Sequence, residues 1–186
     1  AAAASEQALA HLYVDPTAEE GGDGTAGSPF RTLGEAVAVC ADATVIHLAE
    51  GTYAEEACPI DFTGLRHVKV VGAGRDKTVF DLAGRIVTRF ANVADSFDVT
   101  FSDLTVRNVA SKEAECTSIG AAFSITKSGP VVFRSVDFRD CVQTNTNAGS
   151  HKWYYGGIVC IGVGSGASFV DCAFDNCRWH TTNEAD

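Results

Sequence analysis

The 186-residue chain contains no methionine, and it has few basic residues for its acidic ones. Without a methionine Ala1 cannot be an unprocessed initiator, so we expect either a mature product or an excised piece of something longer. Fourteen Lys and Arg against 24 Asp and Glu give a formal net charge of −10. Because that charge would repel a phosphate backbone, the composition argues against nucleic acid as a partner.

Signals for membranes and metals are also lacking. No stretch approaches the roughly 18 uncharged apolar residues that cross a bilayer, and the first ten residues lack the basic start and apolar centre of a signal peptide. The chain has no CxxC, HxxxH or HExxH spacing, which leaves a structural zinc site unsupported. We therefore expect no membrane insertion, no metal and no cofactor.

An internal repeat organises the second half of the chain. Residues 120–125 and 132–141 reappear 36 residues later as 156–161 and 168–177, and an earlier copy, 100–109, lies 32 residues upstream. Alignment of the copies gives three apolar columns: Phe101, Phe133 and Phe169; Leu104, Val136 and Cys172; Val106, Phe138 and Phe174. This period of two, in short segments rich in Val, Phe, Thr and Ile, predicts strands. If each copy is one coil of a parallel solenoid, equivalent residues stack at about 4.8 Å and the columns form the interior.

Asn108, Asp140 and Asn176 form a further column where each strand ends. Asn and Asp tolerate left-handed backbone at corners and bond to neighbouring backbone groups. We interpret this column as a structural ladder rather than a metal or substrate site.

The N-terminal third has a different pattern. Leu33, Ala36, Val37 and Cys40 follow helical spacing, and Thr32 with Glu35 forms a candidate capping box. A short amphipathic helix here would cover the open first coil. We expect a single domain over 1–186, with an N-terminal strand, loop and capping helix in 1–43 and coils in 44–186.

Several motifs resemble a known superfamily. Residues 11–16 (HLYVDP), 24–25, 29–33, 35–37, 44–48, 50–53 and 70–74 look, in that order, like the opening of many right-handed parallel β-helices of the pectate-lyase-like type. The later coils, at 156–159 and 169–177, are similar to repeats of polymorphic outer-membrane-type surface proteins. The resemblance implies an all-β, right-handed parallel β-helix of about five turns with a short N-terminal capping α-helix. It implies activity only weakly, because such folds include lyases, hydrolases, adhesins and inert stalks.

A lyase of this type would bind calcium between outer carboxylates and use an Arg or Lys as base. The outer columns are Ser102, Arg134 and Val170; Thr105, Asp137 and Ala173; Arg107, Arg139 and Asp175. Because calcium takes six to eight oxygens, a lone Asp137 falls short, and Arg139 beside Asp175 predicts a surface ion pair. A hydrolase needs two or three convergent carboxylates; Asp95, Asp98 and Asp103 are close in sequence, but Asp103 sits at an expected bend. We therefore assign no catalytic residue.

The strongest candidate binding feature is aromatic. A loop at 145–155 joins two repeats, and Trp179 lies 36 residues beyond Gln143 at its entry. Exposed Trp and Tyr rings can stack on sugars or anchor a protein partner. The predicted binding residues are His151, Lys152, Trp153, Tyr154, Tyr155, Trp179 and His180. In the other interpretation, Trp153 and Tyr155 fold back to shield the coil.

The chain has seven cysteines, a number that suits an oxidising compartment. Cys141 and Cys177 share a column one turn apart, which falls within disulfide range, and Cys40 with Cys58 could join the cap to the first turn. We expect a secreted or cell-surface location.

After residue 177 no amphipathic segment follows to cover the last repeat. An open strand edge invites pairing, so self-assembly through the C-terminal edge is expected. The sequence favours a non-catalytic extracellular structural or adhesive module that binds a glycan or a partner protein. The alternative is a polysaccharide lyase or glycoside hydrolase acting on an acidic polysaccharide, and only a lyase would need calcium.

Overall fold

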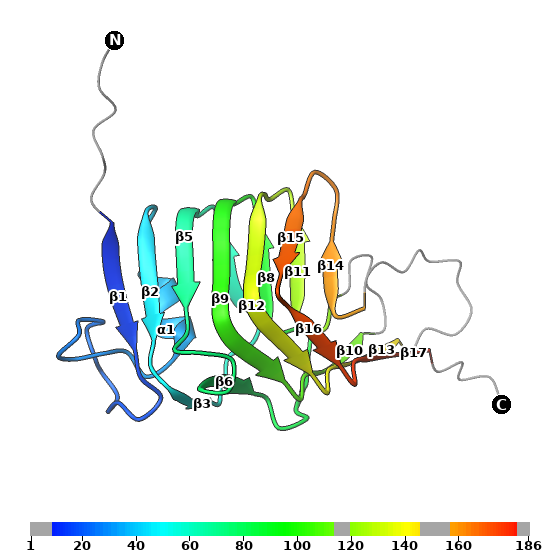
Figure 1. The fold of residues 1–186 in the computed structure, drawn as a ribbon, viewed down its shortest axis with the longest axis horizontal. Helices are drawn as coiled ribbons and strands as arrows, with labels where there is room; N and C mark the ends of the chain where they lie inside the picture. The colour runs from blue at the N-terminus through cyan, green and yellow to red at the C-terminus, as the bar shows by residue number, and fades with distance from the viewer. Residues whose placement is uncertain (1–8, 114–119, 146–156, 182–186) are drawn as a thin grey trace, which may run out of the picture.

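The computed structural model describes residues 9–113, 120–145 and 157–181. Within these ranges the regular structure is β-strand apart from one short helix, α1 (Leu33–Ala38). Successive strands lie side by side along the long axis of the molecule, with further sheets behind and below (Figure 1). The neighbouring named strands pair in parallel. The expected parallel β-helix is confirmed.

The largest sheet has nine strands and faces the viewer in Figure 1. Its main path consists of β1 (Ala10–Val14), β2 (Thr44–Leu48), β5 (Arg66–Val71), β9 (Phe97–Arg107), β12 (Val131–Arg139) and β15 (Ala167–Val170). Three short strands extend it below: β3 (Gly51–Tyr53), β6 (Thr78–Asp81) and β16 (Ala173–Asp175).

Two four-stranded sheets complete the coils. One contains β4 (Ile60–Thr63), β8 (Ala91–Ala94), β11 (Phe123–Thr126) and β14 (Val159–Ile161). The other contains β7 (Ile86–Val87), β10 (Ala110–Glu113), β13 (Val142–Asn145) and β17 (Arg178–Thr181). The coils that run from β5 to β14 each pass through all three sheets, which is why residues thirty-odd positions apart become neighbours.

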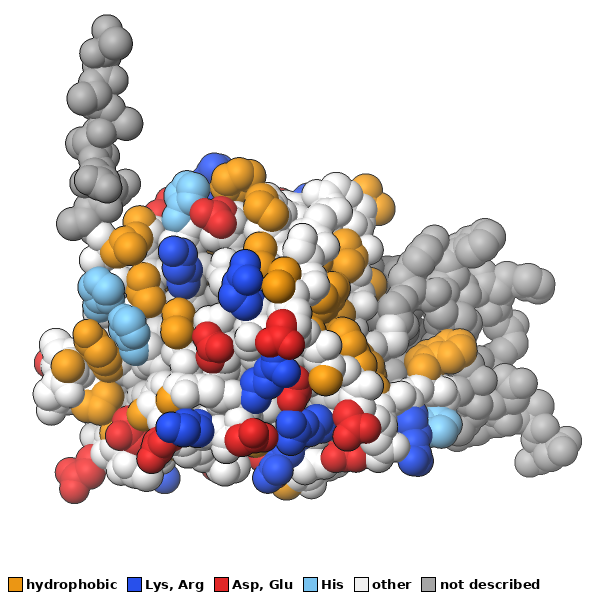
Figure 2. Space-filling view, viewed as in Figure 1, with side chains coloured by type: hydrophobic (Ala, Val, Ile, Leu, Met, Phe, Trp, Pro, Cys, Tyr) orange, Lys and Arg blue, Asp and Glu red, His pale blue; other side chains and the backbone are white. Residues whose placement is uncertain are grey.

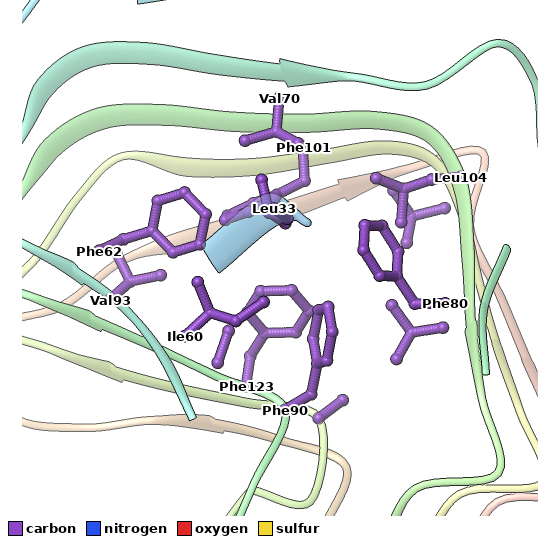
Figure 3. Packing of buried hydrophobic residues seen from close by; sticks show 14 of the residues in the cluster. Leu33, Ile60, Phe62, Val70, Phe80, Phe90, Val93, Phe101, Leu104 and Phe123 are labelled. Carbon is purple, nitrogen blue, oxygen red and sulfur yellow. The ribbon is translucent and has the colours of Figure 1, made fainter. Parts of the chain in front are cut away.

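The predicted apolar columns are in register. Phe101 pairs with Phe133, and Phe133 with Phe169. Their ring centroids lie 5.4 and 5.1 Å apart, with interplanar angles of 12° and 8°. The same columns point into the interior, where Phe62, Phe80, Phe101 and Phe123 converge (Figure 3). Each fully buried phenylalanine contributes about 1.5–3 kcal/mol of transfer free energy, so the ring columns are the main stabilising element.

Left-handed residues mark the bends. Asp103, Ser135 and Asp171 have φ of 58°, 54° and 54°. At these residues the large sheet bends, and they separate its upper part, which we call the front wall, from its lower part, the lower wall. Asn108, Asp140 and Asn176 have φ of 54°, 53° and 49°. The Asn176 amide donates to Asp140 Oδ1 at 2.5 Å. The proposed structural ladder is therefore present.

The capping helix forms as expected. The Thr32 hydroxyl accepts from the Glu35 backbone N–H, and the Glu35 carboxylate accepts in return from the Thr32 N–H. The buried Glu55 carboxylate accepts from the Leu33 N–H at 2.6 Å, so a residue of the first coil satisfies one of the free amides of the helix. Among the described residues no helix has the length and hydropathy needed to span a membrane.

Candidate functional site

The outer side of the front wall presents a surface that we call the front face. Strand alternation turns twelve side chains outward here: His11, Tyr13, Val45, His47, Lys69, Val71, Thr100, Ser102, Val132, Arg134, Ser168 and Val170. None of the twelve is a carboxylate. Figure 2 shows two basic side chains over the middle of this face and histidines at its side, with acidic and basic side chains mixed together below it.

Lys69 and Arg134 are the permanent cations of the front face. Lys69 lies on β5 and Arg134 on β12, two strands apart, which is roughly 10 Å across the sheet. Both side chains are exposed, and neither forms an ion pair with another described residue. The face therefore carries uncompensated positive charge on a chain whose net charge is −10.

Aromatic rings lie at the β1 side of this face. His47 stacks on Tyr13 with ring centroids 4.9 Å apart, and on His11 at 5.1 Å. His11 Nδ1 and His47 Nε2 are 2.8 Å apart, so the two rings share a hydrogen bond. Burial, reinforced by the neighbouring His11, lowers the pKa of His47. Near neutral pH the His47 ring is therefore uncharged, and it stacks between the rings of Tyr13 and His11.

A charged cluster borders the front face at the bend. Arg75, from the loop between β5 and β6, contacts the carboxylate of Asp171 and lies 3.5 Å from Asp137 Oδ1. Asp137 also accepts from Arg139 at 2.6 Å, and Arg139 lies 3.5 Å from Asp76. Thr105 donates to the Arg75 carbonyl at 2.7 Å and so ties the loop to β9.

The cluster corrects two expectations. Arg139 bonds Asp137 and Asp76 rather than Asp175, because the loop carrying Arg75 and Asp76 folds over the lower wall. For the same reason Asp137 and Thr105 are only 4% and 1% exposed, although the strand pattern turns them outward.

The hydrogen bonds of the cluster stabilise the charged forms of Arg75, Arg139 and Asp171. The hydrogen bond from Arg75, with a second from Ser135, lowers the pKa of Asp171. Hydrogen bonding to Asp171 raises the pKa of Arg75, and hydrogen bonding to Asp137 raises that of Arg139. Since Asp137 and Asp171 each contact a guanidinium, neither is placed as a general acid. No group of three or more metal-ligating side chains occurs among the described residues.

The predicted aromatic site is described only in part. His151, Lys152, Trp153, Tyr154 and Tyr155 lie outside the described residues, as does the loop that carries them. Trp179 and His180 are on β17, in register with Gln143 and Thr144. Gln143 is buried, so Trp179 stands in an interior column at the last described coil, where it is 49% exposed. Its role in binding stays a prediction.

Among the described residues, which include every cysteine except Cys116, no disulfide is formed. The Cys141 thiol hydrogen-bonds Cys177, which raises the pKa of Cys141 and lowers that of Cys177 to about 7. The expected column is thus present. The pairings Cys141–Cys177 and Cys40–Cys58 stay predictions, which intact mass with and without reductant would test.

Sequence reasoning missed Arg75. Gly72 lies tightly against the next coil, because a Cβ at this position would be 2.1 Å from the Asp103 carbonyl oxygen. Arg75 follows Gly74 directly, and from there its long side chain reaches Asp137 and Asp171 on later coils. Gly72 and Gly74 are the sequence signal for a turn before Arg75, but they do not determine the direction in which the following loop runs.

Comparison with known proteins places the chain in a family. A family model described as "Protein of unknown function (DUF1565)" matches residues 17–132, more than half of the chain. Over 119 residues the chain is 29% identical to "Uncharacterized protein YwoF" of Bacillus subtilis (strain 168), which covers 59% of this chain and 25% of that protein. The chain thus spans about a quarter of the length of this curated relative.

Solved structures share the fold. A rhamnogalacturonan lyase aligns with a TM-score of 0.53 and 14% identity over 91% of this chain and 51% of that one. The pectin methylesterase PemA from Erwinia chrysanthemi aligns with a TM-score of 0.51 and 16% identity, over 90% and 55%. The chain spans about half the length of these enzymes. At such identity the similarity establishes the fold alone.

Proposed function

The chain belongs to the DUF1565 family of proteins of unknown function, and we propose that it is a non-catalytic binding module whose front face holds an acidic polysaccharide. The observation that carries the proposal is the pair Lys69 and Arg134, two cations without ion-pair partners among the described residues, on a face whose twelve outward side chains include no carboxylate. The nearby carboxylate of Asp98, on β9, is bonded to His67 at 2.8 Å. Opposite charge on the ligand would be favoured there although the chain as a whole is acidic.

The rest of the front face fits a sugar polymer. Thr100 lies between the two cations on β9 and offers a partly exposed hydroxyl, and the Tyr13–His47 stack offers a ring surface to a sugar. A polymer lying across the parallel strands would meet both cations in turn. The proposal places the protein outside the cell or at its surface, where such polymers occur.

The second candidate is a polysaccharide lyase or glycoside hydrolase. The observation in its favour is the position of Asp137 and Asp171 around Arg75, directly beside the front face. Binding is preferred because Asp137 and Asp171 are already bound by guanidinium groups. Calcium belongs only to the lyase alternative.

The test is a calorimetric titration with polygalacturonate and with an uncharged polymer of similar length. We expect binding of the acidic polymer, no release of product with or without calcium, and roughly tenfold weaker binding, about 1.4 kcal/mol, for the Lys69→Ala/Arg134→Ala double variant. Lys77→Ala, a cation away from the front face, is the matched control. Product release would establish the enzyme instead, and equal binding of both polymers would contradict the proposal.

A further inference from the structure

A groove runs along the upper border of the front face, outside the charged cluster and the aromatic stack. Three successive turns line it, at 95–97, 127–130 and 164–166, together with Arg66, and its volume is about 620 Å³. This volume is within the range of small-molecule sites, roughly 300–1,000 Å³.

Buried hydroxyls fix the shape of the groove. The Ser96 N–H donates to Ser128 Oγ at 3.0 Å, and the Ser128 N–H donates to Ser165 Oγ at 3.3 Å. The ladder repeats from coil to coil, so the three turns stay stacked at a constant spacing. The groove is therefore formed before any ligand arrives, which reduces the entropy cost of binding.

The floor and walls have different chemistry. At Gly166, which lines the hollow, a Cβ would meet no atom within 4 Å, so there is room for a side chain at this position. Phe97 and Pro130 supply apolar walls, and Phe97 is 48% exposed. His67 packs edge-on against Phe97. Its ring also bonds Asp98 at 2.8 Å, and this bond holds the His67 ring against Phe97.

Two cations border this hollow. Neither Arg66 nor Lys127 forms a side-chain ion pair with another described residue, and Asp95 is the single carboxylate of the lining. Two further carboxylates lie just outside the lining and already accept hydrogen bonds: Asp42 from the Arg66 backbone N–H, and Asp98 from His67. Within the lining itself two positive charges face one negative charge, which favours an anionic group between Arg66 and Lys127. The exposed ring beside them favours a ligand that also has an apolar face.

We propose that this groove is a second subsite, which binds one uronic acid residue with its carboxylate on Arg66 and Lys127 and its ring against Phe97. The inference rests on the proposed function and extends it. Arg66 precedes Lys69 by three residues on β5, about 10 Å along the strand. A polymer on the front face can therefore place a neighbouring sugar in the groove.

Gly166→Leu tests the subsite by filling it, and Gly27→Leu is the matched control, since a Cβ at Gly27 also meets nothing within 4 Å. Thermal melting confirms that both variants fold. With trigalacturonate as probe, we expect at least about tenfold weaker binding for Gly166→Leu and for Lys127→Ala, and wild-type binding for Gly27→Leu. We also expect residual binding in Lys69→Ala/Arg134→Ala that Gly166→Leu then removes.

Unchanged trigalacturonate binding in Gly166→Leu would overturn the subsite and leave the front-face proposal standing. Full competition by inorganic phosphate would also overturn it, because it would indicate a simple anion site. Absence of any polygalacturonate binding by the wild-type chain would instead contradict the proposed function.

Discussion

The ring of Phe133 lies parallel to that of Phe169, 36 positions later, with centroids 5.1 Å apart and an angle of 8° between the planes. Phe133 also stacks on Phe101 and is fully buried, whereas Phe169 is 38% exposed. A phenylalanine of this column should therefore contribute more to the free energy of unfolding in the middle of the stack than at the last described coil.

Replacing Phe133 with Ala should lower the free energy of unfolding by about 3–5 kcal/mol, because it removes a ring packed on both sides. Phe169→Ala is the matched control and should cost less than half as much, since its ring is packed on one side. Chemical denaturation monitored by circular dichroism measures both. Equal losses would contradict the stacked-column account.

Glu55 predicts a pH-dependent stability. Burial raises its pKa above 4.5, so the folded chain keeps this proton over a range in which the unfolded chain has lost it. The free energy of unfolding should therefore fall as pH rises from about 4.5 through the folded pKa. Glu55→Gln keeps an acceptor for the Leu33 N–H and should remove this contribution. Denaturation of both proteins across that window tests it, and parallel curves would contradict the assignment.

Arg75 should control the titration of Asp171. Its hydrogen bond is the main cause of the lowered pKa of that carboxyl, so the stability it contributes is present above pH 3.8 and is lost as pH falls through the folded pKa. In the Arg75→Ala variant the pKa of Asp171 should rise toward 3.8. Carboxyl-carbon NMR titration reads the value directly. Arg178→Ala, on β17, is the control and should leave it unchanged.

The thiols should differ in reactivity. The pKa of Cys177 is lowered to about 7 by the bond from Cys141, whereas burial raises that of Cys58 to about 11. Because the thiolate is the nucleophile, iodoacetamide at neutral pH should modify Cys177 well before Cys58. Cys141→Ala should slow the modification of Cys177. Peptide mass spectrometry measures the order, and faster labelling of Cys58 would contradict it.

The sequence predicts the columns well because a period of two within a longer repeat determines both the facing of each residue and its vertical neighbour. Phe101, Phe133 and Phe169 are therefore placed correctly, as are the bend at Asp103 and the capping box at Thr32. Each of these features depends on local spacing or on one repeat length.

The candidate site was less predictable. Alternation turns Asp137 outward, but it does not reveal that a loop from another coil covers that position. The partners of Arg139 depend on the same loop. The direction of a loop depends on packing between coils. The repeat spacing of the sequence carries no information about that packing.

The most direct test of the central claim is NMR mapping of the bound surface. Titration of the isotopically labelled chain with trigalacturonate should shift the backbone amides of Lys69, Thr100, Ser102 and Arg134, together with those of Arg66 and Lys127 in the groove, with weaker changes elsewhere. Shifts confined to β17 and the 145–155 loop, with the front face unchanged, would contradict the account and favour the aromatic site instead.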